Sequence, residues 1–140
     1  MTSKTRQFAL IGGVTMLSMG LASFIPQLST PPREARLPRL KVETSYGKFL
    51  RIFPLNVFNK AALTLFGVAG ILASRARTEK PARGFARAVA IAMGPLALLG
   101  VIPRTETLFG MLPLFGAEVA AHGTFAAIGA KVGFTDGLGR

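Results

Sequence analysis

The sequence predicts an all-α protein, a four-transmembrane-helix bundle that forms a single integral membrane domain over residues 1–140. Half of the residues are hydrophobic, and they collect in four long runs with most of the charged residues between them. Each run is long enough, or nearly so, to cross a hydrocarbon core of about 30 Å. A soluble bundle of fully buried helices is the alternative, but it suits one such run better than four. The predicted helices are at about residues 8–25, 55–74, 84–102 and 117–134.

The first run follows Lys4 and Arg6, so it resembles the apolar core of a secretory signal. It is at the long end for such a core, and we therefore expect a retained helix. Residues 26–54 form the predicted extramembrane loop, in which prolines favour extended backbone. Within it, residues 46–53 mix large apolar side chains with two cations, which is typical of a segment lying at the membrane interface. An ordinary connecting loop is the alternative interpretation.

Prolines at the ends of the four runs follow a pattern that divides the chain into two repeated helix hairpins. Pro26 closes the first run and Pro103 closes the third, while Pro54 precedes the second and Pro113 precedes the fourth. Proline lacks an amide donor and is best tolerated at such helix ends. The pattern predicts two similar hairpins related by an axis along the membrane normal. Chance is the alternative, because prolines commonly flank membrane helices.

Small residues recur at helical spacing on the third and fourth runs. Such residues let helix backbones approach closely where lipid supplies no hydrophobic push between helices. The faces could meet within the monomer or against a partner subunit, and the intramolecular contact is the simpler expectation. The predicted packing residues are Ala86, Ala90, Gly94, Gly129 and Gly133.

The charge balance is strongly basic, with 17 Lys and Arg against six Asp and Glu, a formal charge of +11. A nucleic-acid partner is not expected, since the chain has no Trp and one Tyr for stacking on bases. Membrane lipids are the expected partners, because the cations lie at the ends of apolar runs. The short basic segment between the second and third runs, by the positive-inside rule, places both termini in the cytoplasm. The predicted headgroup-binding residues are Arg75, Arg77, Lys80, Arg83 and Arg87.

A few polar residues fall within or beside the runs, where each needs a structural or functional reason. Lys60 either reaches toward the headgroups or pairs with Glu118 near the outer ends of the helices. Glu118 and His122 are four residues apart and therefore share a helix face. A structural hydrogen bond across helices is the first interpretation of this pair. The predicted structural polar contacts are Asn56, Asn59, Lys60, Glu118 and His122.

A cofactor is the second interpretation of the Glu118–His122 pair, since one imidazole can ligate the metal of a haem or a chlorophyll-type pigment. Proton or ion handling is the third. No protein metal site is expected, because the chain has one His, no Cys and six acids. No catalytic residues are expected either, since no nucleophile, dinucleotide or phosphate-binding motif is present.

Residues from Phe53 to His122 carry a resemblance to a known family. They include a Phe-Pro-x-Asn sequence (Phe53 to Asn56), a Gly-x-Ile-Pro sequence (Gly100 to Pro103) and His122. With these motifs, residues 45–134 resemble a domain-of-unknown-function family of small four-helix membrane proteins in bacteria and cyanobacteria. Members of that family often have histidines early in the second helix, where this chain has Asn59 and Leu63. The resemblance implies four helices in a bacterial inner membrane or a photosynthetic membrane.

These observations favour a non-enzymatic integral membrane protein. The first hypothesis is a structural or accessory subunit that packs against other subunits of a larger photosynthetic or bioenergetic membrane complex. The second is a protein that contacts chlorophyll or haem through His122. The third is a small transporter or channel, which the apolar midplane of the runs disfavours.

Overall fold

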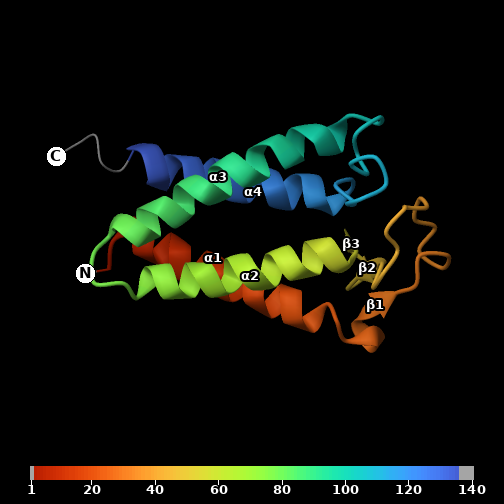
Figure 1. The fold of residues 1–140 in the computed structure, drawn as a ribbon, viewed down its shortest axis with the longest axis horizontal. Helices are drawn as coiled ribbons and strands as arrows, with labels where there is room; N and C mark the ends of the chain where they lie inside the picture. The colour runs from red at the N-terminus through yellow and green to blue at the C-terminus, as the bar shows by residue number, and fades with distance from the viewer. Residues whose placement is uncertain (1, 136–140) are drawn as a thin grey trace.

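A computed structural model describes residues 2–135 of the chain, and in this range it is mostly helical. Four α-helices run side by side from one end of the molecule to the other (Figure 1). They are α1 (Lys4–Ala22), α2 (Val57–Ser74), α3 (Lys80–Val101) and α4 (Ala117–Ala130), and a π-helical turn, η2 (Lys131–Thr135), continues α4. The four predicted helices are therefore present, with their ends shifted by up to about a turn.

The first helix begins and ends earlier than the apolar run, and local hydrogen bonds explain both ends. The Ser3 hydroxyl accepts a hydrogen bond from the Arg6 amide at 3.2 Å, which caps the helix upstream of the apolar residues. At the other end the Ser23 hydroxyl donates to the carbonyl of Gly20 at 2.8 Å. A short 3-10 helix, η1 (Pro26–Leu28), follows, because proline cannot continue an α-helical hydrogen-bond ladder.

The all-α prediction is wrong for the loop between α1 and α2. Strands β1 (Ser29–Thr30), β2 (Gly47–Phe49) and β3 (Phe53–Leu55) form a small antiparallel sheet in the order β1-β2-β3. The segment predicted to lie at the interface is thus a β-hairpin. Its burial alternates along β2, so that Phe49 faces inward and Lys48 does not. Pro54 is accommodated because β3 is an edge strand.

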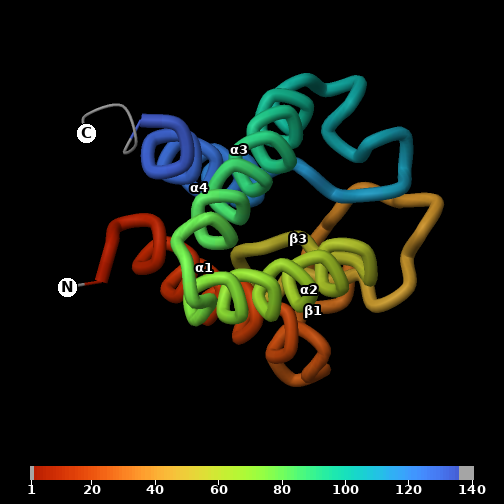
Figure 2. The backbone as a smooth tube through the Cα atoms, turned by 60° about the vertical axis from the view of Figure 1, so that its left-hand side comes forward, coloured from red at the N-terminus to blue at the C-terminus, as the bar shows by residue number. Residues whose placement is uncertain are grey.

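The helices form two hairpins, α1 with α2 and α3 with α4, and contacts within each hairpin far outnumber those between them (Figure 2). Glycines on both α1 and α2 bring the first pair together. A Cβ added to Gly13 would lie 2.9 Å from the carbonyl oxygen of Gly67, and one added to Gly70 would lie 2.7 Å from that of Ala9. Backbones this close leave no room for a side chain, which is the packing that small residues permit.

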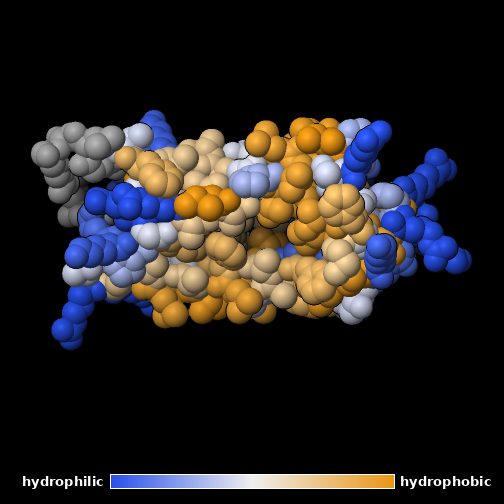
Figure 3. Space-filling view, turned by 45° about the horizontal axis from the view of Figure 1, so that its top comes forward, coloured by the Kyte–Doolittle hydropathy of each residue, from blue (hydrophilic) through white to orange (hydrophobic). Residues whose placement is uncertain are grey.

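The hydrophobic core lies where the two hairpins meet. Phe8 of α1 and Phe85 of α3 pack with ring centroids 6.1 Å apart, and Met16 and Val89 are fully enclosed beside them. The core is small, because more of the large apolar side chains are exposed than are buried. The helices therefore present an apolar outer surface, seen as a hydrophobic band with hydrophilic side chains at both ends (Figure 3).

Two of the helices in the described range, α2 and α3, are long and apolar enough to cross a membrane. Helix α1 has the length, but it carries Lys4, Arg6 and several hydroxyl side chains. Helix α4 has 14 residues, which span about 21 Å at about 1.5 Å per residue. With η2 the helical path continues to Thr135.

Candidate functional site

A buried asparagine pair joins the start of α2 to both loops at the sheet end of the molecule. The Asn56 side-chain oxygen accepts from the amides of Phe58 and Asn59, and its amide nitrogen donates to the carbonyls of Val42 and Met111 at 3.0 and 2.9 Å. All the hydrogen-bonding capacity of this fully buried side chain is used. Asn56 is therefore an architectural residue that holds the two loops against one helix.

Asn59 completes this network from the next turn of α2. Its side-chain oxygen accepts from the Asn56 amide at 2.9 Å, and its amide nitrogen donates to the carbonyl of Pro113 at 3.2 Å. The reciprocal bonds between the two asparagines form a capping box. The loops are also joined directly, since the amides of Lys41 and Val42 both donate to the carbonyl of Gly110.

Lys60 does not pair with Glu118 in the described structure. Its ammonium group lies over the ring of Phe24, 5.3 Å from the ring centroid, just past the end of α1. This is a cation–π contact, and the side chain is almost fully buried by it and by its neighbours. The lysine therefore ties α2 to the end of α1, within the first hairpin.

Glu118 and His122 lie on one face of α4, one turn apart. The Glu118 Oε2 atom is 3.5 Å from Nε2 of His122, at the outer limit of a hydrogen bond. The Glu118 side chain is 93% buried, since 7% of its area is exposed, yet among residues 2–135 no hydrogen-bond donor lies closer to it than His122. The Nδ1 atom of His122 is buried without a partner. This pair, unlike the asparagines, is incompletely bonded.

The pair lines a cavity of about 270 Å³ between the two hairpins. Residues from all four helices surround it, and its walls are otherwise almost wholly apolar, as at Met19, Phe66, Leu96 and Phe125. Figure 3 shows a hollow in the hydrophobic surface of the molecule. A mostly apolar cavity with one polar wall is the usual form of a small-molecule site, and this volume is just below the usual range of about 300–1,000 Å³.

A haem or chlorophyll metal at His122 would have to reach Nδ1, because Nε2 is directed to Glu118. An axial ligand must offer one free ring nitrogen to the metal. The Nδ1 atom is enclosed. Within residues 2–135 no group of three or more His, Asp and Glu side chains is placed to hold a metal ion.

The predicted packing residues of α3 and α4 meet each other within the chain. A Cβ on Gly129 would lie 2.7 Å from the carbonyl oxygen of Ala86 and 3.4 Å from the amide of Ala90. Gly133 lies against the backbone of Arg87, and Gly94 faces Ala126 at ordinary contact distance. This small-residue face is therefore occupied inside the second hairpin and is not available to a partner subunit.

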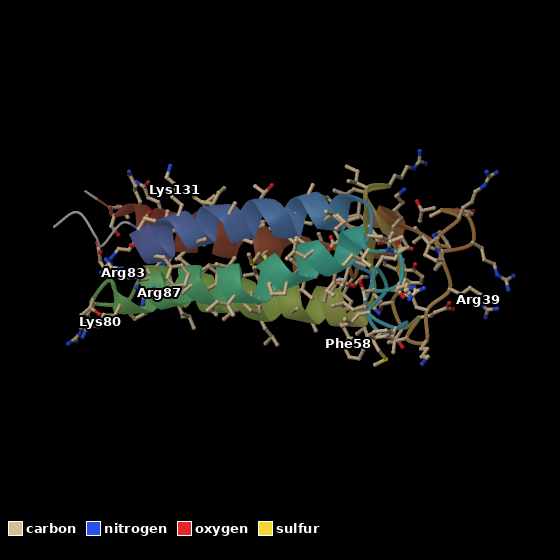
Figure 4. The ribbon with its side chains drawn as sticks, turned by 90° about the horizontal axis from the view of Figure 1, so that it is seen from above. Arg39, Phe58, Lys80, Arg83, Arg87 and Lys131 are labelled. Carbon is tan, nitrogen blue, oxygen red and sulfur yellow. The ribbon has the colours of Figure 1, made fainter. Side chains whose placement is uncertain are left out.

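The predicted headgroup-binding residues gather at one end of the molecule, the cationic end, but two of them have partners in the protein. Arg87 donates to the carbonyl of Gly133 at 2.7 Å and stacks on Phe134, and Arg83 lies 3.7 Å from a carboxylate oxygen of Glu79. Figure 4 shows Lys131 at the same end, with Arg39 and Phe58 at the other. Of the predicted headgroup-binding residues, Arg75, Arg77, Lys80 and Arg87 are exposed, and Arg83 is half-buried.

Sequence reasoning missed the glycine contacts between α1 and α2. Gly13 and Gly20 are seven residues apart and therefore share a face of α1, and both lie against the backbone of α2. Their spacing was a signal for the contact. No sequence spacing predicted that Ala92 and Ala121 line one cavity, because this depends on how the two hairpins pack against each other.

The comparisons with known proteins give a family and nothing narrower. No curated protein and no solved structure matches the chain. A family model matches residues 6–135, a longer stretch than residues 45–134, over which the resemblance was predicted. The chain belongs to the family described as Domain of unknown function (DUF4383).

Proposed function

We propose that this chain is a non-enzymatic integral membrane protein whose four helices all cross the bilayer. Helices α1 and α4 run beside α2 and α3 over the same span (Figure 1). The outer side chains of the helices are apolar and exposed, as at Ile11 (66%), Leu65 (70%) and Leu98 (68%). Exposed apolar side chains on every helix are suited to lipid, because water would leave a large hydrophobic surface uncovered.

The charges support a cytoplasmic cationic end. This end contains the start of α1, the α2–α3 turn and the end of η2, and its one acid among the described residues is Glu79. The sheet end dilutes its cations with Glu34, Glu43 and Glu106. Positive residues in short loops remain on the cytoplasmic side, and this rule supports the proposal that both termini are cytoplasmic.

The natural absence of cysteine makes this orientation easy to test. Arg39→Cys would place a thiol at the sheet end and Thr78→Cys would place one in the α2–α3 turn. We expect an impermeant maleimide to label Arg39→Cys in intact cells and Thr78→Cys after lysis. The reverse pattern would invert the topology, and release of the protein by alkaline carbonate would overturn the membrane proposal.

The sheet end favours an accessory subunit of a larger membrane complex, and two turns carry this proposal. Leu50 and Arg51 of the β2–β3 turn have φ of 52° and 58°, and Leu108 and Phe109 have φ of 44° and 58°. Left-handed backbone costs such residues about 1–2 kcal/mol each. Leu50 and Phe109 are nevertheless 50% and 68% exposed. Strained turns that hold apolar side chains outward are suited to contact with another subunit.

Gentle extraction from native membranes, native gel separation and mass spectrometry test the subunit proposal. We expect the chain to migrate with a larger complex, whose absorption spectrum identifies photosynthetic or bioenergetic cofactors. Leu50→Ser with Phe109→Ser should release it, whereas Arg33→Ser with Arg39→Ser should not. A discrete monomer from wild-type membranes would overturn the proposal.

A second function is favoured by the cavity at Glu118 and His122. It is the binding of a small, neutral, lipid-soluble molecule with a hydroxyl head. A hydroxyl both donates and accepts, so it can serve the Glu118 carboxyl while an apolar body contacts Phe66 and Leu96. Entry from the hydrocarbon would be through the hollow in the apolar surface (Figure 3).

A photoreactive long-chain alcohol and its matched alkane test this second function. We expect the alcohol to label peptides of α2 and α4, and the labelling to fall in Glu118→Gln and in Ala121→Phe, which fills the cavity. Leu65→Phe, on the outer face of α2, is the control. Equal labelling by the alcohol and the alkane would contradict a hydroxyl-specific site. A visible absorption band lost in His122→Ala would assign a tetrapyrrole instead.

A further inference from the structure

A groove of about 610 Å³ runs between α1 and α4, apart from the cavity described above. It exists because the molecule is two hairpins, in which α1 packs on α2 and α4 packs on α3, so that α1 and α4 touch at few points. Its floor is apolar, with Phe8 and Phe125 packed edge to face and Gly12 close to the Phe125 ring. The outer walls are formed by Ile11 and Ile128, both exposed.

Two lysines close the groove at the cationic end. Lys4 comes from the first turn of α1, and Lys131 follows the last residue of α4, so segments far apart in sequence supply them. Figure 4 shows Lys131 at this end. Within residues 2–135, neither lysine forms an ion pair. The start of α1 adds the positive end of a helix dipole to the two ammonium groups.

We propose that this groove binds one anionic phospholipid, with an acyl chain between α1 and α4 and the phosphate at Lys4 and Lys131. The proposal rests on the membrane-spanning arrangement proposed above, because only then do the lysines lie at headgroup depth. Charge complementarity selects the occupant, since an apolar groove that ends in two lysines, neither of them in an ion pair among residues 2–135, matches a lipid with a negative headgroup. A zwitterionic lipid would fill the groove equally well, but its headgroup would gain less binding free energy from the lysines.

The site differs from the general attraction of a basic protein to anionic membranes. Arg75 and Arg77 lie at the same end and are exposed, yet they do not line the groove. Lys4→Gln with Lys131→Gln therefore removes the same charge as Arg75→Gln with Arg77→Gln. The first pair of substitutions removes both cations of the proposed headgroup site, and the second pair leaves them in place.

Native mass spectrometry of the full chain in neutral detergent tests the proposal, with phosphatidylglycerol and phosphatidylcholine of identical acyl chains as probes. We expect one phosphatidylglycerol molecule to bind roughly tenfold or more tightly than phosphatidylcholine, since two lysines attract its net negative headgroup. Lys4→Gln with Lys131→Gln should remove this preference, and Arg75→Gln with Arg77→Gln should retain most of it. An equal loss in both double variants would overturn the site in favour of general electrostatics.

Filling the groove tests the proposed acyl-chain site while both lysines remain. Thr124 of α4 and Thr15 of α1 both line the groove and are exposed, so either can be replaced by Trp without entering the core. We expect Thr124→Trp and Thr15→Trp each to lower phosphatidylglycerol binding at least fivefold with unchanged thermal stability. Full binding by both variants would overturn the groove. Competition by millimolar inorganic phosphate would assign a phosphate site in place of a lipid site.

The outcomes also separate this inference from the proposed function. Release of the protein by alkaline carbonate would remove both the membrane proposal and the lipid site. A chain that resists carbonate but shows no preference for phosphatidylglycerol would overturn the lipid site alone.

Discussion

Two buried polar pairs occupy corresponding places where the two hairpins meet the sheet end of the molecule, and they differ in how completely they are bonded. In the first hairpin, Asn56 and Asn59 use their side-chain groups to bind each other and three backbone carbonyls. In the second, Glu118 has His122 at 3.5 Å as its near polar neighbour, and Nδ1 of His122 has none. A satisfied pair holds the fold, whereas an unsatisfied pair beside a cavity is available to a ligand.

The difference has an energetic meaning. Removing a partner from a complete buried network leaves the remaining carbonyls without donors, and each costs about 1–3 kcal/mol. Altering a group that is bound by one long contact leaves little newly unsatisfied. Substitutions in the Asn56–Asn59 pair should therefore mainly lower stability, whereas substitutions in the Glu118–His122 pair should mainly lower ligand binding.

The largest effect is expected from Asn56→Ala. It removes the cap of α2, worth about 1 kcal/mol, and strands the carbonyls of Val42 and Met111, so the total loss should be about 3–5 kcal/mol. The measurement is the free energy of unfolding of the purified protein in detergent micelles. Asn56→Asp keeps the capping oxygen but sets a carboxylate oxygen against the carbonyls of Val42 and Met111, and should lose at least as much. A cost below about 1 kcal/mol for Asn56→Ala would show that the network is not structural.

Asn59→Ala should cost less, about 2 kcal/mol, because it frees one carbonyl, that of Pro113, and one amide, that of Asn56. The same unfolding measurement applies. In the double variant with Asn56→Ala the two losses should not add, since the residues share a hydrogen bond. Strict additivity would argue that the two asparagines act independently.

Tyr46 provides a smaller test of the sheet end, which the asparagines hold in place. Its hydroxyl donates to the carbonyl of Pro38 at 2.9 Å, and Tyr46→Phe should cost about 1 kcal/mol at neutral pH. Burial, with a lesser effect from Glu43, raises the pKa of Tyr46 from 10.0 to about 12. The phenol therefore stays neutral to a higher pH in the folded state than in the unfolded state.

The pH dependence follows from that difference in pKa. The contribution of Tyr46 is complete below the unfolded pKa of 10.0 and is lost as the pH rises through the folded pKa of about 12. Unfolding midpoints of wild type should fall over this interval, and the part due to Tyr46 should be missing in Tyr46→Phe. Parallel pH profiles for the two proteins would contradict this assignment.

The smallest effect on stability is expected from Glu118→Gln, within about 1 kcal/mol of wild type, because one long contact is altered. The same variant should have the largest effect on labelling by the photoreactive alcohol. Thermal unfolding and labelling measured on one preparation separate the two. A loss of stability equal to that of Asn56→Ala would make the Glu118–His122 pair architectural too, and would remove the contrast between the pairs.

Much of the fold could be predicted from the sequence, because helices in this chain are local. The apolar runs, the prolines at their ends and the cap at Asn56 are each read within one stretch of the chain. The family was also predictable from the motifs at Phe53 to Asn56 and Gly100 to Pro103. The loop was not, since β1 pairs with β2 across 16 intervening residues, from Thr30 to Gly47, and such pairing has no local signal.

By itself the sequence determined the four helices, the basic character of one end and the residues that carry polar groups into the apolar runs. These properties depend on composition and helical spacing, which need no tertiary contact. Tertiary structure alone decided which polar residues are satisfied. The Asn56 amide meets carbonyls 14 and 55 residues away, while Glu118 faces a cavity. It also brought Lys4 and Lys131 to one groove, because hairpin packing, rather than sequence spacing, sets which helix ends become neighbours.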